Sequence, residues 1–381
     1  MLSEDQAQVR DMVRRFADEV IRPIAGGLDE SERFPSEIYD QMAELGLFGI
    51  GVPAELGGAG MDTMAYALVM EELSRGYASV ADQCGLVELI GTLLTRYGTD
   101  GQRERWLRPL LTGKRRCAYA ITEADAGSDV SGLRTTATGT ATGWRLDGGK
   151  LWIHNAPVCD FAVVLARTDK DAGRRGMSIF IVDADRPGFS RGPKEHKMGQ
   201  RASPVGALHF DAIELPEEAL LGPEGRGFHI MMSVLDKGRV GISALAIGVA
   251  QAGMEAAIGY ARQRRQFGRA IAENQGLQWL LADMAKDIQA ARLLTWDAAS
   301  RIDRGEPATM ACSMAKCMAG DVAVAQTANA VQVFGGSGYI KGVEVERLYR
   351  DAKICQIYEG TQQIQRTIIA RELLKASEAS A

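Results

Sequence analysis

The chain has 381 residues, of which 46% are hydrophobic and 24% are charged, and its formal net charge is -5. This composition is typical of a globular protein with two or three domains, and the mild acidity gives no reason to expect nucleic-acid binding. No apolar run approaches the roughly 20 residues of a membrane-spanning helix, and residues 1–5 lack the basic start of a signal peptide. We therefore expect a cytoplasmic protein without membrane insertion.

The N-terminal part, to about residue 116, is predicted to be helical. Apolar residues recur at spacings of three and four over residues 9–24, which gives one apolar helix face. Similar patterns cover residues 36–47 and 61–111. Residues 49–54 loosely match a GxGxxA dinucleotide fingerprint, but they follow a helix rather than a strand, which argues against a Rossmann fold.

The middle part, residues 117–222, is predicted to be a compact β-domain. Residues 144–153 alternate around Asp147-Gly148-Gly149 and predict a hairpin. Residues 161–166, 177–182 and 207–215 also have strand character. Helical periodicity then returns over 223–381, where an apolar stripe over residues 277–291 predicts a bundle helix.

The cysteines and histidines do not predict a metal centre. The six cysteines form no CxxC pair, and the four histidines lie far apart without HExxH spacing. Because zinc sites and redox motifs depend on such spacings, we expect reduced thiols and no bound metal.

Three segments have residue types that suit an anionic or aromatic ligand. Residues 119–129 end a strand-like run with small and hydroxyl-bearing side chains, whose N–H and O–H groups can bind phosphate. Arg264 and Phe267 belong to a second segment, where guanidinium groups could grip a pyrophosphate. Residues 332–339 carry three glycines that permit close backbone approach. A plain turn or a solvated helix end explains each segment taken alone.

Glu359 lies among apolar and aromatic residues, with Gly360 beside it. Partial burial would raise the pKa of its carboxyl group, which suits a general base. A surface glutamate is the alternative explanation of the same pattern.

In this order and spacing, the segments resemble the acyl-CoA dehydrogenase family over nearly the whole chain. The most specific motifs are residues 121–129, 264–268 and 346–366. The resemblance implies an α+β multidomain fold with a helical N-terminal domain, a central β-barrel-like domain and a C-terminal four-helix bundle. It also implies FAD bound between the middle and C-terminal domains, a homotetramer, and an electron-transfer flavoprotein as electron acceptor.

The resemblance assigns roles residue by residue. In the middle domain, the residues that would contact FAD are Tyr119, Ile121, Thr122, Ser128, Trp152, Ile153 and His154. In the C-terminal domain they are Arg264, Phe267, Gln275, Thr361 and Gln363, with Gln332, Val333, Gly335 and Gly336 from the adjoining subunit. The residues beside the acyl-CoA would be Ser128, Asp236, Arg239 and Gly360, and Glu359 would be the catalytic base.

Three positions need separate comment. Gly238 matches the position where some relatives place their base; glycine cannot act as one, and its small size is similar to the short-chain members. His154 stands where the family usually has Thr or Ser, so its imidazole could tune the flavin or point elsewhere. Glu88 is a charge within an apolar helical run, and we expect it to face solvent; contact with a polar acyl chain is the alternative.

The expected reaction is FAD-dependent α,β-dehydrogenation of an acyl-CoA thioester to the trans-2-enoyl-CoA. Glu359 would take the α-proton while flavin N5 accepts the β-hydride. An acyl-CoA oxidase, an enoyl-CoA reductase or a desulfinase would use the same scaffold. From another class, a non-catalytic CoA-binding or flavin-storage subunit is the competing hypothesis.

Overall fold

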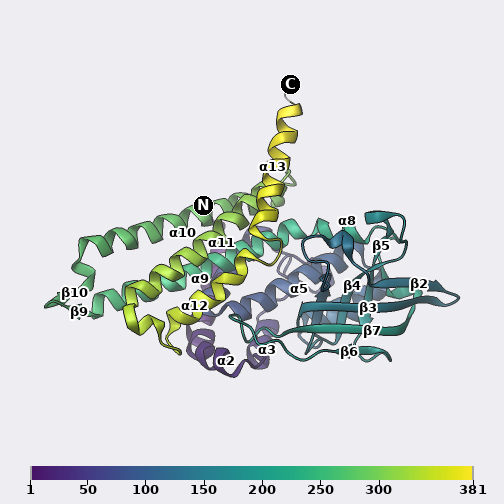
Figure 1. Cartoon of the computed structure of the whole chain (residues 1–381), viewed down its shortest axis with the longest axis horizontal. Coiled ribbons are helices and arrows are strands. Elements are labelled where there is room, and N and C mark those ends of the chain that lie inside the picture. The colour runs from purple at the N-terminus through teal and green to yellow at the C-terminus, as the bar shows by residue number, and fades with distance from the viewer. Residues whose placement is uncertain (1, 380–381) are drawn as a thin grey trace.

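The computed structural model describes residues 2–379, which form a helical, a β and a second helical part in chain order (Figure 1). The principal N-terminal helices are α1 (Glu4–Phe16), α2 (Ala25–Ser31), α3 (Ser36–Glu44), α4 (Thr63–Gly76), α5 (Ala78–Tyr97), α6 (Asp100–Gln102) and α7 (Arg108–Leu111). Ser3 and Gln6 cap α1 reciprocally, and the Asp62 side chain caps α4. The α–β–α order predicted from periodicity is confirmed.

The β part forms one mixed eight-stranded sheet in the order β6-β7-β3-β2-β4-β5-β8, with β1 paired to β4. Its strands are β1 (Cys117–Ala120), β2 (Thr136–Thr140), β3 (Gly143–His154), β4 (Phe161–Arg167), β5 (Met177–Asp183), β6 (Phe189–Arg191), β7 (Val205–Pro216) and β8 (Leu220–Leu221). Strands β4 and β5 are buried on both faces, since apolar side chains of the β part pack on one side and helical residues on the other.

The hairpin predicted around Asp147-Gly148-Gly149 is wrong. These residues lie within the continuous strand β3, which pairs with β7 on both sides of them. Gly148 adopts φ +138°, and the register with β7 shifts between Leu146 and Gly148, so the glycine forms a bulge instead of a turn. The hairpin joins β2 to β3, where Thr140 pairs with Gly143.

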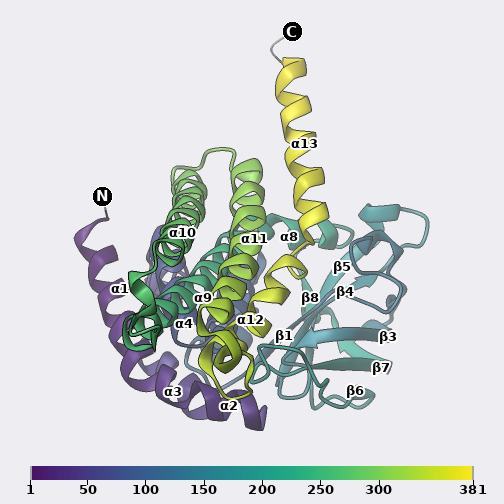
Figure 2. The same ribbon diagram turned by 60° about the vertical axis from the view of Figure 1, so that its left-hand side comes forward.

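Three long helices build most of the C-terminal part. The helices of this part are α8 (Gly227–Ser233), α9 (Leu235–Gln263), α10 (Gln275–Asp303), α11 (Thr309–Phe334), α12 (Glu344–Ala352) and α13 (Gln362–Ala379), and a short hairpin of β9 (Arg265–Gln266) and β10 (Arg269–Ala270) joins α9 to α10. Helix α9 packs against α10, α11 and the N-terminal helix α4. Helix α13 contacts α11 near its start and then projects away from the molecule (Figures 1 and 2). The domain limits 1–116, 117–222 and 223–381 stay predictions.

One helical stretch, residues 227–263, is long and apolar enough to cross a membrane, although the sequence showed no obvious run of that kind. In its most apolar window, 72% of the residues are buried inside the protein. They pack within the apolar core that the N-terminal and C-terminal helices share. The stretch therefore serves as a core helix of the fold.

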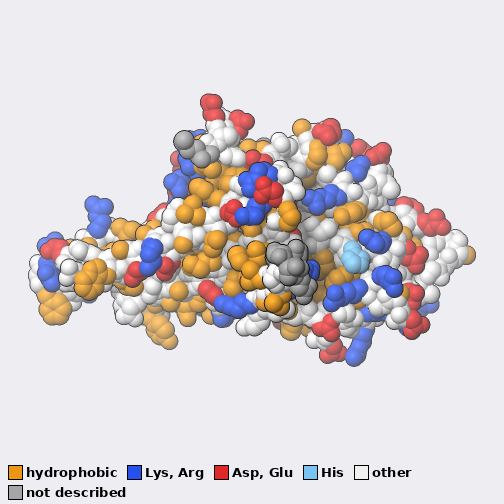
Figure 3. Space-filling view, turned by 90° about the horizontal axis from the view of Figure 1, so that it is seen from above, with side chains coloured by type: hydrophobic (Ala, Val, Ile, Leu, Met, Phe, Trp, Pro, Cys, Tyr) orange, Lys and Arg blue, Asp and Glu red, His pale blue; other side chains and the backbone are white. Residues whose placement is uncertain are grey.

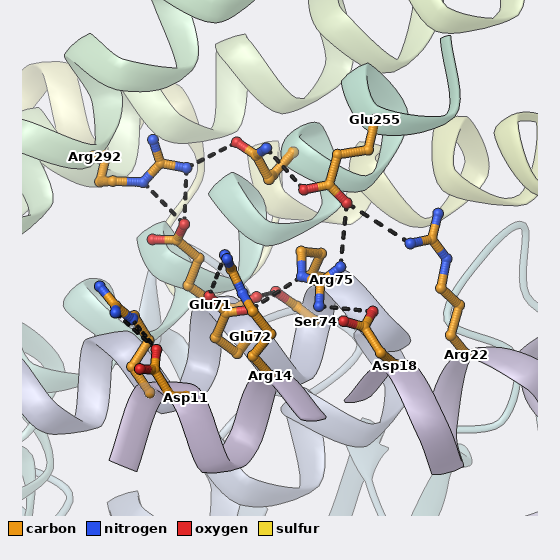
Figure 4. Close-up of polar contacts among 12 residues, drawn as sticks. Asp11, Arg14, Asp18, Arg22, Glu71, Glu72, Ser74, Arg75, Glu255 and Arg292 are labelled. Carbon is orange, nitrogen blue, oxygen red and sulfur yellow. Dashed lines mark hydrogen bonds and ion pairs between the residues drawn. The ribbon is translucent and has the colours of Figure 1, made fainter. Parts of the chain in front are cut away.

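A charged network ties the two helical parts together (Figure 4). Arg75 of α4 is almost completely buried and forms ion pairs with Asp18 at 2.8 Å, Glu72 at 3.0 Å and Glu255 at 3.2 Å. Glu71 of the same helix pairs with Arg292 of α10 at 2.8 Å. Since these partners come from α9, α10 and the segment after α1, the network fixes how the N-terminal helices sit on the C-terminal bundle.

Candidate active site

Glu359 lies in a tight left-handed turn between the 3-10 helix Lys353–Gln356 and α13. Its φ is +54° and that of Gly360 is +90°, a conformation that is unfavourable for a glutamate and is kept only where the surroundings hold it. Gln365 Nε2 donates to the carbonyls of Glu359 at 3.0 Å and Gly360 at 3.1 Å, and Lys316 Nζ donates to the Gly360 carbonyl at 2.7 Å. We call these three hydrogen bonds the clamp. A Cβ on Gly360 would lie 2.7 Å from Gln365 Nε2, so the clamp requires glycine at position 360.

The Glu359 side chain is half-buried, and one of its two carboxyl oxygens is unpaired among the described residues. Its Oε2 is buried and has no hydrogen-bond partner within residues 2–379. Burial raises the pKa of Glu359 to about 7, although the cations Arg239 and Lys316 oppose the shift. A group with this pKa exchanges its proton near neutral pH.

Gly238 of α9 lies directly against this carboxyl group. A Cβ added there would stand 3.1 Å from Glu359 Oε2 and 3.6 Å from Cδ. Glycine has no side chain that could act as a second base, and its lack of a Cβ lets the Glu359 carboxyl group approach α9 closely.

Tyr119 of β1 brings the β part next to Glu359. Burial raises the pKa of its phenol well above the usual value, and the nearby charge of Glu359 adds to the effect. The Tyr119 hydroxyl donates to the Met231 carbonyl of α8 at 3.4 Å. Glu359, the candidate base, therefore lies where the β part and the C-terminal helices meet.

The loop of residues 121–129 is anchored by a buried ion pair. Lys150 Nζ of β3 lies 2.8 Å from Glu123 Oε1 and donates to the Ile121 carbonyl at 2.9 Å. Burial lowers the pKa of Lys150 to about 8 against the opposing charge of Glu123. The Leu151 N–H donates to the Thr122 carbonyl at 2.9 Å. The loop is thus fixed to β3, with Thr122 half-buried and Ser128 exposed.

His154, at the end of β3, is directed toward α5. Its Nε2 lies 2.9 Å from Gln83 Nε2 and 2.7 Å from Ser203 Oγ. Gln83 Nε2 can only donate to the ring, whereas the Ser203 hydroxyl donates its proton to Asp82 Oδ2 at 2.8 Å, so the two contacts favour opposite tautomers of the imidazole. Burial lowers the pKa of His154, with Asp82 opposing, so the imidazole is neutral at pH 7.

Comparisons with known proteins identify the family. The profile of the acyl-CoA dehydrogenase N-terminal domain matches residues 3–114, that of the middle domain residues 118–213, and that of the C-terminal domain residues 225–374. The chain belongs to the acyl-CoA dehydrogenase family. Such proteins are oxidoreductases, and the family is FAD-dependent.

Three relatives show the range of this similarity. The caffeyl-CoA reductase-Etf complex subunit CarC of Acetobacterium woodii is 44% identical, over 98% of this chain and 99% of the relative. The structure of butyryl-CoA dehydrogenase from Megasphaera elsdenii superposes with a TM-score of 0.95 at 38% identity, over 98% of this chain and 99% of the other. A structure of PigA with FAD and proline has a TM-score of 0.94 at 29% identity, over 98% of both chains.

In this acyl-CoA dehydrogenase chain, the predicted FAD residues fall into two separate groups. One lies in the β part and at the start of α13: the β-part residues Tyr119, Ile121, Thr122, Ser128, Trp152, Ile153 and His154, and Thr361 and Gln363 after Glu359. The other lies by the β9–β10 hairpin, at the opposite end of the bundle (Figure 1): Arg264, Phe267, Gln275, Gln332, Val333, Gly335 and Gly336. Stacking of Tyr260 on Phe334, at 4.1 Å between ring centroids, joins the ends of α9 and α11 there.

The residues present fit FAD if two copies contribute. Trp152 is 60% exposed with φ +55°, and Phe267 is fully exposed with φ +50°. Exposed aromatic rings on constrained backbone suit a ligand with a flat ring system, and Arg264, also exposed, suits a pyrophosphate. Because the two predicted groups lie at opposite ends of the bundle, they cannot contact the same FAD within one chain.

Lys316 and Lys237 are candidate site residues that the sequence analysis missed, and Glu88 was predicted on the wrong side of its helix. Glu88 is 1% exposed, so its predicted solvent-facing position is wrong; Lys237 from α9 compensates its charge inside the protein. Lys316 is the only charged residue in residues 309–320 of α11. A single charge in this otherwise uncharged segment was the sequence signal that Lys316 has a specific polar partner inside the protein, which is the Gly360 carbonyl.

Proposed function

We propose that the chain catalyses the α,β-dehydrogenation of an acyl-CoA thioester to the trans-2-enoyl-CoA, with Glu359 as the base. The observation that supports this is a carboxyl group with a pKa of about 7, whose buried and unpaired Oε2 lies against Gly238. A general base is most effective when its pKa lies near the working pH.

The residues around Glu359 have complementary tasks. The Glu359 carboxylate removes the α-proton, and burial favours the neutral acid that results. The left-handed turn at residues 359–360 presents the Glu359 N–H as a donor to the thioester oxygen, where negative charge develops. Arg239 and Lys316 keep a fraction of Glu359 ionised, and Asp236, which pairs with Arg239 at 2.7 Å, orients that cation beside the substrate. When bound, FAD supplies the acceptor for the β-hydride.

We propose that the working form is a cytoplasmic homotetramer that passes electrons to an electron-transfer flavoprotein. The division of the FAD residues into two groups supports assembly, and so do the exposed hydrophobic side chains of the helical part (Figure 3). On α10 and α13 these are Trp279, Leu293, Leu294, Leu373 and Leu374. Exposed apolar clusters of this kind mark protein–protein interfaces. The relative CarC is described as part of an Etf complex.

Anaerobic mixing of the holoenzyme with butyryl-CoA and related saturated acyl-CoAs tests this function. We expect the flavin absorbance to bleach with at least one saturated acyl-CoA, and to return slowly when air is admitted. Rapid return with peroxide formation would identify an oxidase instead. No bleaching with straight, branched, aromatic or dicarboxylic acyl-CoAs would contradict the proposed direction.

Reduction of an enoyl-CoA is the second candidate, because CarC is named a caffeyl-CoA reductase and is 44% identical. The same residues would serve it, since Glu359 would return a proton to the α-carbon. The dithionite-reduced holoenzyme mixed with crotonyl-CoA distinguishes the two directions. Fast reoxidation of the flavin by crotonyl-CoA, together with no flavin bleaching by saturated acyl-CoAs, would favour the reductase.

The pH dependence of flavin reduction should follow Glu359. At pH values between the ordinary glutamate pKa and about 7, Glu359 of the free enzyme is protonated and cannot act as a base. We therefore expect kcat/KM to rise with pH and to level off above about 7. Lys316→Met removes a cation that lowers the Glu359 pKa and should move the inflection to higher pH. Rapid-mixing rates at low butyryl-CoA concentration measure both curves.

Lys286→Met is the matched control, because Lys286 is an exposed lysine on α10 whose partner is Asp283. Its curve should coincide with that of the wild type. An unchanged inflection in Lys316→Met would show that Glu359 does not determine the profile.

A further inference from the structure

Glu88 and Lys237 form an ion pair inside the protein that the proposed chemistry does not use. Lys237 Nζ of α9 lies 2.5 Å from Glu88 Oε1 of α5, and the Gly51 N–H donates to the same oxygen at 3.0 Å. Buried charges persist in proteins when they are paired and hydrogen-bonded. One oxygen of Glu88 meets this condition.

The other oxygen does not. Glu88 Oε2 is buried and finds no hydrogen-bond partner in the described part of the chain. An unpaired buried acceptor is rare because its lost hydration is not replaced. It therefore marks a place where a ligand can supply the missing donor.

The pair borders the same region as Glu359. Lys237 precedes Gly238, whose added Cβ would lie 3.1 Å from Glu359 Oε2 and 3.8 Å from the side chain of Leu89, which follows Glu88. Tyr66 lies near both carboxylates: burial raises the pKa of its phenol, and the charges of Glu88 and Glu359 add to the shift. Lys237 Nζ lies 5.7 Å from the centroid of the Tyr66 ring.

The surrounding backbone is shaped to accommodate the pair. A Cβ on Gly51 would stand 2.2 Å from Lys237 Nζ and 2.8 Å from Glu88 Oε1. A side chain at position 51 would displace the lysine or break its contact with the glutamate. Gly51 thus has a steric role, and the GxGxxA resemblance of its segment does not explain it.

We propose that Glu88 and Lys237 form a polar subsite for the acyl group, which selects acyl-CoAs with a hydroxyl group on the chain. The inference rests on the proposed function, because it specifies the chemical group carried by the acyl chain of the proposed acyl-CoA substrate. The hydroxyl proton is donated to Glu88 Oε2, and Lys237 holds the carboxylate in position through Oε1. Glu88 and Lys237 are specificity residues, and Glu359 remains the base.

The charge balance of the pair favours a neutral donor. Lys237 already neutralises Glu88, so the carboxylate of a dicarboxylic acyl group would meet Glu88 without a free cation. A plain alkyl chain would leave Oε2 unpaired. A hydroxyl group supplies one donor and no charge, and sites built to bind a hydroxyl discriminate strongly against analogues that lack it.

The test measures binding separately from catalysis. Dissociation constants are determined by calorimetry with the Glu359→Gln holoenzyme for matched ligands that differ at one terminal group. The aliphatic pair is 4-hydroxybutyryl-CoA and pentanoyl-CoA, and the phenolic pair is 3-(4-hydroxyphenyl)propionyl-CoA and 3-phenylpropionyl-CoA. We expect the hydroxylated ligand of one pair to bind about 10-fold or more tightly than its partner, and the preferred pair shows whether the site takes an alcohol or a phenol.

Variants assign the preference to the ion pair. In the same background, E88L with K237M removes both charges and should abolish the preference while FAD content and the unfolding midpoint are kept. Glu88→Gln is a second, milder variant and should reduce it. The exposed pair of Arg33 and Glu37, replaced by R33Q with E37Q, is the control and should retain the preference.

Equal or tighter binding of the unsubstituted ligand in both pairs would overturn the subsite, and so would a preference that survives E88L with K237M. Failure of the proposed function has a different result. It would show as absent bleaching by every saturated acyl-CoA, while the binding preference of Glu359→Gln would still be measured.

Discussion

Replacing Glu359 with glutamine should slow flavin reduction by butyryl-CoA at least roughly 100-fold, the scale of general-base catalysis. Glutamine keeps the size and burial of the side chain, but its amide cannot accept the α-proton. The clamp from Lys316 and Gln365 acts on the backbone carbonyls of residues 359 and 360, so the turn should persist. FAD content and acyl-CoA binding should therefore stay near the wild-type values in stopped-flow and titration experiments.

Two further variants make this result specific. Glu217→Gln changes an exposed glutamate of the β part and should leave the rate unchanged. Gly238→Glu combined with Glu359→Gly should restore part of the lost rate, because a side chain at 238 starts 3.1 Å from the present position of Glu359 Oε2. Near-normal bleaching by Glu359→Gln would exclude Glu359 as the base.

The succession of helical and β parts was predictable because periodicity is a local property of the sequence. Residues 161–166 and 177–182 were recognised as strands, and they form β4 and β5. The hairpin at Asp147-Gly148-Gly149 was not predictable in the same way. Turn and bulge glycines look alike in sequence, and the choice was made by pairing with β7, about 60 residues later.

The candidate site was predictable only where a motif fixed it. Glu359 was found through its register with the other family segments, whereas its clamp by Lys316 depends on how α11 packs. Glu88 was misplaced because a lone charge in an apolar helix usually faces solvent. Its partner Lys237 is 149 residues away in sequence, so the pairing exists only in the folded chain.

Replacing Arg75 with methionine should lower the free energy of unfolding by about 3–5 kcal/mol, the scale for breaking a buried ion pair by removing one partner. Methionine fills much of the space, but it leaves Glu72 buried with only Arg14 and deprives Glu255 and Asp18 of a shared cation. Because these groups join α1 to α9, the loss should loosen the N-terminal helices first. Urea unfolding followed by far-UV circular dichroism measures the shift.

Arg33→Met is the control, since the exposed Arg33–Glu37 pair should contribute at most about 1 kcal/mol. Adding Glu72→Gln to Arg75→Met should recover part of the stability, because it removes the carboxylate that the first change left without its buried cation. Equal losses in Arg75→Met and Arg33→Met would mean that burial of the network adds nothing. A larger loss that Glu72→Gln partly reverses would show that the penalty comes from the stranded carboxylate rather than from the packing of the arginine stem.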